Sequence, residues 1–376
     1  MNQLTVHFEE KPVYQITLSD SFRDLLPSLS GLSLADRRIC IVTDSTVGSL
    51  YAQEIAGILT PAAAEVRIFT FPAGEASKNL NTVEAVYRFL IAHQFDRHDL
   101  IAALGGGVVG DLAGFSAASY LRGIDFIQIP TSLLSMVDSS IGGKTGVDFE
   151  TYKNMVGAFK QPKAVYINVS VLKTLTERQF LSGFPEVIKH GLLEDRPLYD
   201  YLRAHDEALT AHDPDALLAM IESSLKDKRK IVEEDPFEQG SRAMLNLGHT
   251  IGHSIERLAG FRLLHGECVS LGCAAAAWIS ARRGLISRDD LHEIVDTFQL
   301  FHEPVSFQSP CFLEACGDMQ LSEDELIRIT RNDKKMRAGQ IRFILLARIG
   351  QAFIAPDVTE NEMRGAIRFL AGQNLL

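Results

Sequence analysis

Three consecutive glycines, Gly105–Gly107, constrain this chain more than any other stretch. They directly follow an apolar run, Leu100–Leu104, which is typical of a buried strand, and small and apolar residues at helical spacing come next. A strand, a glycine turn and a helix start together form a phosphate cradle, because glycine lets backbone N–H groups approach a phosphate and the helix N-terminus carries a partial positive charge. The order is not that of the G-x-G-x-x-G dinucleotide fingerprint, so a plain tight turn is the competing interpretation.

Strands alternate with helices through the first part of the chain. Strands are expected at 38–44, 66–71, 100–104, 126–130 and 164–169, and helices at 47–59, 82–93 and from the glycines to about 121. This alternation predicts a parallel sheet, in which ligands bind at the carboxyl ends of the strands. Asp44 ends one strand, where an acid can bind a ribose hydroxyl. The stretch 131–148 is rich in hydroxyls and glycines and includes Lys144, which suits a diphosphate or a substrate.

Long helical patterns take over after about residue 175. Helices are expected at 177–193, 197–208, 215–234, 243–258, 268–283, 288–298 and 322–331, and a strand hairpin at 340–347 and 351–354. At 376 residues the chain is long enough for two domains of roughly 100–200 residues each. We therefore predict an α/β fold in which a Rossmann-like, parallel-sheet nucleotide-binding domain over residues 1–175 precedes a mainly helical metal- and substrate-binding domain over residues 176–376.

Composition excludes several classes of protein. The net charge of −11 argues against a general nucleic-acid surface. Five cysteines without a CxxC pair predict buried thiols in a reducing cytoplasm. The N-terminus lacks the pattern of a signal peptide. The longest apolar stretch, 269–279, is far shorter than the roughly 20 residues that cross a bilayer, so no membrane partner is expected.

The helical half concentrates ionisable residues in apolar surroundings. Glu186 and Lys189 stand three residues apart, and His265 precedes Gly-Glu. Gly248 and Gly252 each cost ~1 kcal/mol inside a helix relative to alanine, which indicates close packing or a helix start shaped for a ligand. Four polar residues recur at i, i+4, i+7 and i+11, a spacing that predicts one stripe along a helix: Arg242, Asn246, His249 and His253.

Two imidazoles and a carboxylate around an open position compose a catalytic divalent-metal site, above all for zinc. His249 and His253, at i and i+4, can chelate one ion, although no glutamate stands between them as in HExxH. The other set is Glu186, His249 and His265, which leaves His253 for acid–base or phosphate contact. Spacing leaves both sets open. Each histidine alone, or a lone Glu186–Lys189 pair, would more often be structural.

With these motifs in view, the sequence resembles the 3-dehydroquinate synthases of the shikimate pathway, within the sugar-phosphate cyclase family. The resemblance runs from about Asp44 to Lys335. Departures from the family pattern are Ser132, Met136 and Pro236, and none removes a group that the chemistry needs. The matching motifs are G-G-G-V-V-G-D-L-A-G-F from 105, R-G from 122, P-T-S-L-L from 130, D-S-S-I-G-G-K-T-G from 138, K-N-M-V-G-A-F from 153, Glu186 with Lys189, L-N-L-G-H-T-I-G-H from 245 and H-G-E from 265.

The resemblance implies two cofactors and a ligand set for each. One divalent metal, Zn²⁺ or Co²⁺, would sit on Glu186, His249 and His265. NAD would be held by Asp44, Glu75, Lys78, Gly105, Gly106, Gly107, Val108, Asp111, Thr131, Ser132, Asp138, Lys144, Lys153 and Asn154. The sugar-phosphate acid substrate would be bound by Asp138, Lys144, Asn154, Lys189, Lys228, Arg242, Asn246, His253 and Lys334.

The implied reaction converts 3-deoxy-D-arabino-heptulosonate 7-phosphate into 3-dehydroquinate and phosphate. Its steps are transient oxidation by NAD, phosphate elimination, re-reduction and aldol ring closure. The resemblance further implies a lyase that works as a cytoplasmic homodimer.

Three other functions compete with this one. A metal-dependent polyol or glycerol dehydrogenase shares the two-domain layout, and 2-deoxy-scyllo-inosose synthase is another sugar-phosphate cyclase. Neither substrate carries a carboxylate, so Arg242, whose planar fork suits one, argues against both. The third is a catalytically inactive nucleotide-binding regulator, and the retained ionisable groups argue against it.

Overall fold

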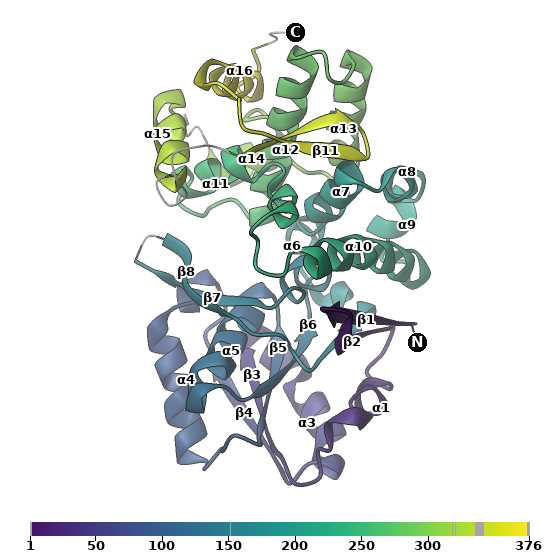
Figure 1. Ribbon diagram of the computed structural model, residues 1–376, viewed down its shortest axis with the longest axis vertical. Helices are drawn as coiled ribbons and strands as arrows, with labels where there is room; N and C mark the ends of the chain where they lie inside the picture. The colour runs from purple at the N-terminus through teal and green to yellow at the C-terminus, as the bar shows by residue number, and fades with distance from the viewer. Residues whose placement is uncertain (1, 151, 318, 320, 335–341, 374–376) are drawn as a thin grey trace. The chain divides into compact units, whose positions relative to one another are not determined.

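The structure is a computed structural model that describes residues 2–150, 152–317, 319, 321–334 and 342–373. The chain divides into two compact units, and most of their helices and strands are labelled in Figure 1. The first unit is Met1–Leu175 with Lys228–Phe237, and the second is Thr176–Asp227 with Glu238–Leu376. One boundary therefore falls after Leu175. The short segment Lys228–Phe237, which the sequence pattern assigns to the helical half, belongs to the first unit.

The first unit is built on a seven-stranded sheet of order β1-β2-β9-β6-β5-β3-β4. All neighbouring strands run parallel except β1 and β2, which pair antiparallel at one edge, so the predicted parallel sheet is confirmed. Five of the parallel strands were predicted to within one residue at each end, and four of these five are buried along most of their length, as continuous apolar runs indicate. The strands are β1 (Asn2–Phe8), β2 (Lys11–Ser19), β3 (Arg38–Asp44), β4 (Glu65–Phe71), β5 (Leu100–Gly105), β6 (Asp125–Pro130) and β9 (Ala164–Asn168).

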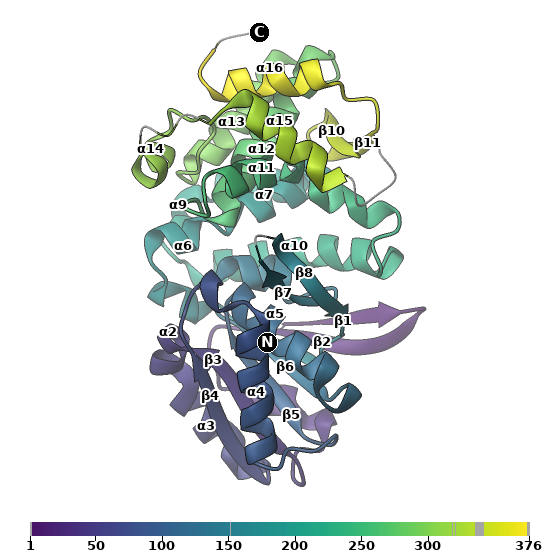
Figure 2. The same ribbon diagram turned by 90° about the vertical axis from the view of Figure 1, so that its left-hand side faces the viewer.

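Helices α4 (Leu80–Ala92) and α5 (Gly107–Ser119) cover one face of this sheet (Figure 2). Val86 of α4 and Leu112 of α5 are fully buried in one core with Ile101 of β5. This packing aims the N-terminus of α5 at the carboxyl end of β5. Three shorter α-helices also belong to this unit: α1 (Leu25–Ser28), α2 (Ser45–Val47) and α3 (Gln53–Leu59).

A second sheet in this unit is the antiparallel hairpin of β7 (Lys144–Phe149) and β8 (Tyr152–Phe159). The polar stretch 131–148, for which the sequence pattern predicts a binding role and no strand, contains most of β7. The hairpin packs on α5 at Gly114, where a Cβ would lie 2.4 Å from the Thr145 Cγ2. The small residues that suggested a ligand loop thus also allow a strand to approach a helix closely.

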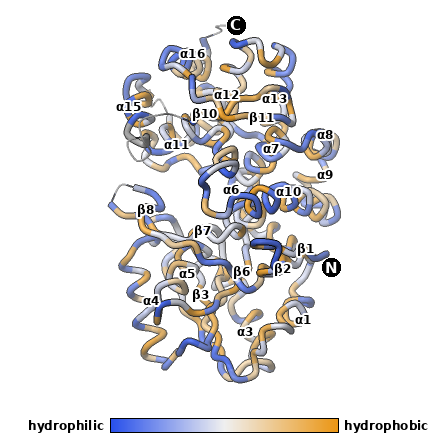
Figure 3. The backbone as a smooth tube through the Cα atoms, in the orientation of Figure 1, coloured by the Kyte–Doolittle hydropathy of each residue, from blue (hydrophilic) through white to orange (hydrophobic). Residues whose placement is uncertain are grey.

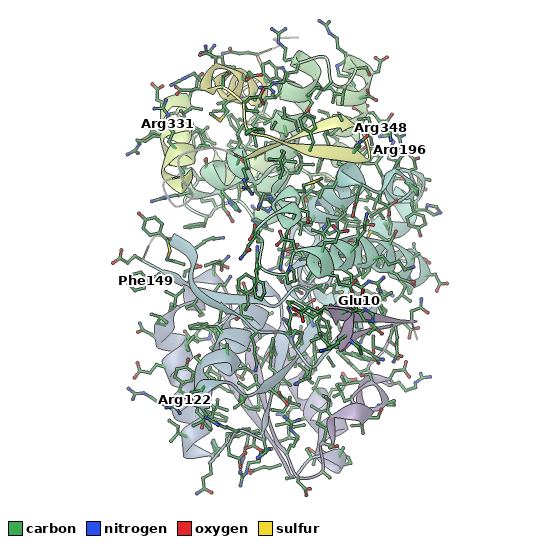
Figure 4. All side chains as sticks on the ribbon, in the orientation of Figure 1. Glu10, Arg122, Phe149, Arg196, Arg331 and Arg348 are labelled. Carbon is green, nitrogen blue, oxygen red and sulfur yellow. The ribbon has the colours of Figure 1, made fainter. Side chains whose placement is uncertain are left out.

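The second unit surrounds helix α12 (His265–Arg282), which is buried from Gly266 to Ser280. Figure 3 shows apolar residues gathered at α12 and at the hairpin of β10 (Phe343–Arg348) and β11 (Gln351–Ala355). The hairpin turn lies against α8 (Arg196–Ala204), because a Cβ at Gly350 would be 2.9 Å from the Cβ of Arg196, which is labelled in Figure 4. Residues 340 and 341 of the predicted first strand lie outside the described residues.

Three predicted helices of this unit are each two elements. Region 177–193 is α6 (Glu177–Leu181) and α7 (Phe184–Leu193), and region 197–208 is α8 (Arg196–Ala204) and α9 (Asp206–Thr210). Region 243–258 is a 3₁₀ helix, η8 (Ser241–Asn246), followed by α11 (His249–Leu258). The other helices are α10 (Pro214–Glu234), α13 (Arg288–Leu300), α14 (Pro310–Cys316), α15 (Glu323–Lys334) and α16 (Glu360–Leu370), of which α14 and α16 were missed. Within the described residues, none of the helices has the length and apolar character needed to cross a membrane.

Candidate functional site

A buried carboxylate in the second unit faces two histidines from other helices. Glu186 of α7 has no exposed surface, and its Oε1 lies 3.6 Å from the Nε2 of His249 and 3.4 Å from the Nε2 of His265. Tetrahedral ligands with bonds of roughly 2.0–2.1 Å stand about 3.4 Å apart, so these separations fit one shared ion. The donor set of two imidazoles and one carboxylate suits Zn²⁺ or Co²⁺.

Each histidine has its other ring nitrogen near an oxygen. The Nδ1–H of His249 donates to the Leu247 carbonyl at 3.1 Å, and the Nδ1 of His265 lies 3.7 Å from the Oε1 of Glu256. Such partners leave Nε2 as the metal-binding atom. Glu256 was not among the residues predicted for the site. Its position seven residues after His249 could have indicated it, because residues seven apart lie on one face of a helix, here α11.

Charge in this cluster favours an ionised Glu186. Burial alone would raise the pKa of Glu186, but Lys189, which contacts its Oε2, and both histidines hold that pKa well below its usual range. Burial and the Lys189 charge lower the pKa of His249. Burial alone would also lower the pKa of His265, but Glu186 and Glu256 raise it to about 9. A metal ion would therefore displace a proton from His265.

His253 lies in the same cluster. One ring nitrogen from each of His249, His253 and His265 falls within a group whose members are all within 4.8 Å of one another. The ring centroids of His253 and His265 are 5.7 Å apart. The fold thus brings together the residues of both candidate ligand sets, the His249–His253 pair and the set of Glu186, His249 and His265. Of these residues, Glu186 lies at ligand spacing from two Nε2 atoms.

The predicted single stripe from Arg242 to His253 is wrong. Arg242 and Asn246 lie on η8, and Gly248, with φ of 80°, separates them from α11. A Cβ at Gly248 would lie 2.8 Å from the Val269 carbonyl oxygen. The close-packing interpretation of Gly248 and Gly252 is confirmed, since a Cβ at Gly252 would lie 2.6 Å from the Cys268 oxygen of α12. Arg242 is 3% exposed, and the Nδ2 of Asn246 donates to the Oε1 of Glu238 at 3.1 Å.

In the first unit the glycine turn forms the predicted strand–turn–helix. Gly105 ends β5 and Gly107 begins α5. A Cβ at Gly105 would lie 2.4 Å from the Val109 Cγ2, and Cβ atoms at Gly106 and Gly107 would lie 3.4 Å and 3.2 Å from the hydroxyls of Ser132 and Ser139. Side chains therefore cannot be added at Gly105 without displacing α5. The open backbone beside serine hydroxyls suits a phosphate group.

Other predicted residues lie around this turn. Thr131 is buried, and its N–H donates to the Gly105 carbonyl at 3.0 Å. Val108 packs against the core that α5 covers. The carboxylate of Asp44 caps α2, because its Oδ1 accepts hydrogen bonds from the N–H groups of Thr46 and Val47 at 2.8 and 2.9 Å.

Lys78 joins two other predicted residues in a buried polar cluster. Its Nζ donates to Asp111 Oδ2 and Asn154 Oδ1, both at 2.6 Å. Burial alone would lower the pKa of Lys78, but Asp111, Glu75 and Asp148 raise it, and burial raises the pKa of Asp111. The Nζ of Lys153 lies 3.4 Å from the Oε1 of Glu75.

The remaining predicted residues are placed as follows. The Nζ of Lys228, on α10, lies 2.5 Å from the Oδ1 of Asp138 and also contacts the Asp138 carbonyl oxygen. Lys144 is exposed at the start of β7. The side chain of Lys334 lies outside the described residues.

Family matches and sequence relatives all point to one family, the 3-dehydroquinate synthases. Residues 68–182 match the family described as "3-dehydroquinate synthase N-terminal", and residues 183–336 match the family described as "3-dehydroquinate synthase C-terminal". The chain is 39% identical over 352 residues to the 3-dehydroquinate synthase of Acetivibrio thermocellus, covering 93% of this chain and 94% of that one. It is 42% identical over 327 residues to that of Ruegeria pomeroyi, covering 86% and 87%.

Solved structures share the fold. The 2-epi-5-epi-valiolone synthase of Streptomyces hygroscopicus, with NAD⁺ and Zn²⁺ bound, has a TM-score of 0.86 at 29% identity and covers 96% of this chain and 97% of that one. A 2-deoxy-scyllo-inosose synthase, complexed with carbaglucose-6-phosphate, NAD⁺ and Co²⁺, has a TM-score of 0.83 at 24% identity and covers 98% and 100%. A probable glycerol dehydrogenase from Sinorhizobium meliloti, at 16% identity and a TM-score of 0.65, covers 95% and 96% and shares the fold alone.

Proposed function

Because the chain belongs to the 3-dehydroquinate synthase family, we propose that it converts 3-deoxy-D-arabino-heptulosonate 7-phosphate into 3-dehydroquinate and phosphate, as a phosphate-eliminating lyase. The observation that carries the proposal is the convergence of Glu186, His249 and His265 from three helices of a unit that also buries Arg242. The substrate of a polyol dehydrogenase carries no carboxylate that Arg242 could bind.

The metal would be held by Glu186, His249 and His265, and the 29% identical valiolone synthase, with Zn²⁺ and NAD⁺ bound, supports one divalent ion here. Bound there, the ion would supply Lewis acidity that lowers the pKa of the hydroxyl to be oxidised. Lys189 contacts Oε2 of Glu186 and so leaves Oε1 directed at the two Nε2 atoms. The Leu247 carbonyl orients His249 by accepting its Nδ1–H.

NAD would lie at the glycine turn between β5 and α5, where it would supply reversible hydride acceptance. The N–H groups that open α5 would bind its diphosphate, and Ser132 would add a hydroxyl beside them. Lys78, held rigidly by Asp111 and Asn154, would place a positive charge at this edge of the unit. Asp44, at the end of β3, would accept from a ribose hydroxyl.

The charged and polar side chains of the site match the carboxylate, phosphate and hydroxyl groups of the proposed substrate. Arg242 would bind the carboxylate through two parallel N–H donors. Lys144, Lys189 and His253 would bind the phosphate or the hydroxyls, and Asn154 would donate or accept as the hydroxyls require. Asp138 is held by Lys228 and would orient a hydroxyl. The chain's contribution to rate would be orientation of groups and fixed charge, since the cofactor and substrate carry most of the bond changes.

The cellular setting is also a proposal. All five cysteines are free thiols, which supports a reducing compartment such as the cytoplasm. We propose a homodimer from the family resemblance, to be measured by sedimentation equilibrium.

The decisive experiment separates cyclisation from net oxidation. The proposed reaction oxidises and re-reduces one carbon, so NAD⁺ acts catalytically. With NAD⁺ far below the heptulosonate 7-phosphate, phosphate should be released over many turnovers, while NADH absorbance stays at or below one equivalent of enzyme. NADH that accumulates one-for-one with consumed substrate would establish a dehydrogenase instead.

A further inference from the structure

The three proposed metal ligands come from three helices, so each imidazole must be oriented separately. His249 and His265 each begin a helix, α11 and α12, and Glu186 lies in the first turn of α7. A metal-binding histidine almost always donates its other ring N–H to a partner, which fixes the tautomer and the orientation of the ring. For His249 that partner is a neutral carbonyl two residues away in sequence, Leu247.

His265 has a charged partner from a different helix. Its Nε2 faces Glu186, and its Nδ1 lies 3.7 Å from Oε1 of Glu256. The His265 ring is therefore placed between two carboxylates, of which one faces the proposed ion and the other faces away from it. Glu256 is 3% exposed and lies next to Ile255, which is fully buried. Burying a carboxylate is costly unless it pairs with another group, so packing alone gives no reason for an acid at this position.

We infer that Glu256 is a positioning residue for the metal site: it holds the Nδ1–H of His265 and thereby presents Nε2 to the ion. The inference rests on the proposed metal at Glu186, His249 and His265. Helix α11 would then supply a ligand in its first turn and, two turns later on the same face, the residue that orients the ligand of α12.

A second buried acid near His265 has a different role. The Nε and Nη2 of Arg178 donate to the Oε1 and Oε2 of Glu267, at 2.6 and 2.8 Å. The Oε2 of Glu267 also accepts the Leu264 N–H at 2.7 Å. These contacts hold the start of α12 rather than the imidazole. Glu256 is therefore the acid whose loss should change the metal and not only the helix.

The test compares metal binding by wild type, Glu256→Ala and Glu256→Gln. Metal-free proteins are titrated with Co²⁺, affinity is measured by chelator competition, and the Co²⁺ visible spectrum reports ligand geometry. Glu256→Ala should weaken Co²⁺ binding by about 10–100-fold and alter the spectrum. Glu256→Gln should retain more affinity and a spectrum closer to wild type, because its amide oxygen still accepts the Nδ1–H.

The matched control is Glu303→Gln. Glu303 is 4% exposed in the same unit, and burial raises its pKa well above the ordinary range, so glutamine resembles its protonated form. This variant should bind Co²⁺ as wild type does.

The inference is overturned if Glu256→Ala and Glu256→Gln both keep wild-type affinity and spectrum, or if Glu303→Gln loses as much affinity as they do. If Glu256→Ala does not fold, Glu256→Gln decides the question by its spectrum. Failure of the wild-type protein to bind Co²⁺ would instead overturn the proposed metal site.

Discussion

The Nζ of Lys78 lies 2.6 Å from the Oδ2 of Asp111, and both groups are largely withdrawn from solvent. The same ammonium also donates to Asn154, so one lysine joins α5 to β8. The two contacts hold the glycine turn and the hairpin in one arrangement.

Lys78→Met should destabilise the protein by about 3–5 kcal/mol, because it leaves the buried carboxylate of Asp111 without its cation. Urea unfolding without NAD measures the loss. Adding Asp111→Asn should recover part of it. Arg88→Ala, which breaks the exposed pair with Glu84, should leave the unfolding midpoint close to that of wild type. Equal effects of the two single substitutions would contradict the buried pair.

His265→Ala should reduce bound Zn²⁺ to well below one ion per chain, because the ion would lose one of three ligands. His253→Ala should keep stoichiometric metal while it loses activity. Elemental analysis of the purified, dialysed proteins distinguishes them. Full metal in His265→Ala, with loss in His253→Ala, would assign the site to the i, i+4 pair instead.

Arg242→Met should lower kcat/KM for the heptulosonate 7-phosphate by at least 100-fold, since a buried charged contact to a carboxylate typically contributes about 2–5 kcal/mol. NAD affinity, measured by fluorescence titration, should stay within twofold of wild type. A comparable loss of NAD affinity would show that Arg242 is not specific to the substrate.

Gly272→Ala should destabilise the second unit by about 1–3 kcal/mol or more. A Cβ at Gly272 of α12 would lie 1.7 Å from the Gly248 carbonyl oxygen, so α11 and His249 would have to move. Gly57→Ala is the control: nothing lies within 4 Å of its Cβ position on α3, and it should stabilise by about 0.5–1 kcal/mol. Thermal unfolding with and without metal checks both. Unchanged stability in Gly272→Ala would disprove the close helix contact.

The Arg283–Glu362 pair should make stability depend on pH in acid. Arg283 holds the pKa of Glu362 at about 2, against an ordinary value of 4.5. Because the folded pKa is depressed, the stabilisation is present above pH 4.5 and is lost as the pH falls toward 2. Glu362→Gln should therefore cost about 1 kcal/mol at pH 7, by urea unfolding, and progressively less below pH 4.5. A difference that stays constant from pH 7 to pH 3 would contradict this assignment.

The sequence predicted β3, β5, β6 and β9 well because strands buried on both faces read as continuous apolar runs. The edge strand β4 is only partly buried, yet it was predicted to within one residue as well. The β7–β8 hairpin was missed because its small and polar residues carry no such run. Gly248 was read as a glycine within a helix, and only backbone geometry shows that it takes a left-handed conformation as the N-cap of α11, after η8 has ended at Asn246.

Residue spacing also limits what can be predicted of the metal cluster. It constrains residues of one helix, such as His249 and His253, but Glu186 and His265 come from other helices. Their distances depend on how α7, α11 and α12 pack, which no local pattern contains. The choice of Glu186, His249 and His265 over the i, i+4 pair came from the family resemblance, and it remains a prediction.

Helix α10 belongs to both units, and this has a consequence for the order in which the chain is made. Its last turns supply Lys228 to Asp138, and Glu233 accepts the backbone N–H of His7 at 2.7 Å. The first unit therefore cannot be completed on the ribosome until residue 237 has emerged, by which time residues 176–227 of the other unit have already been synthesised. A fragment that ends at residue 175 would leave Asp138 and the edge strand β1 without these contacts. The first unit is therefore incomplete when it is expressed as residues 1–175 alone.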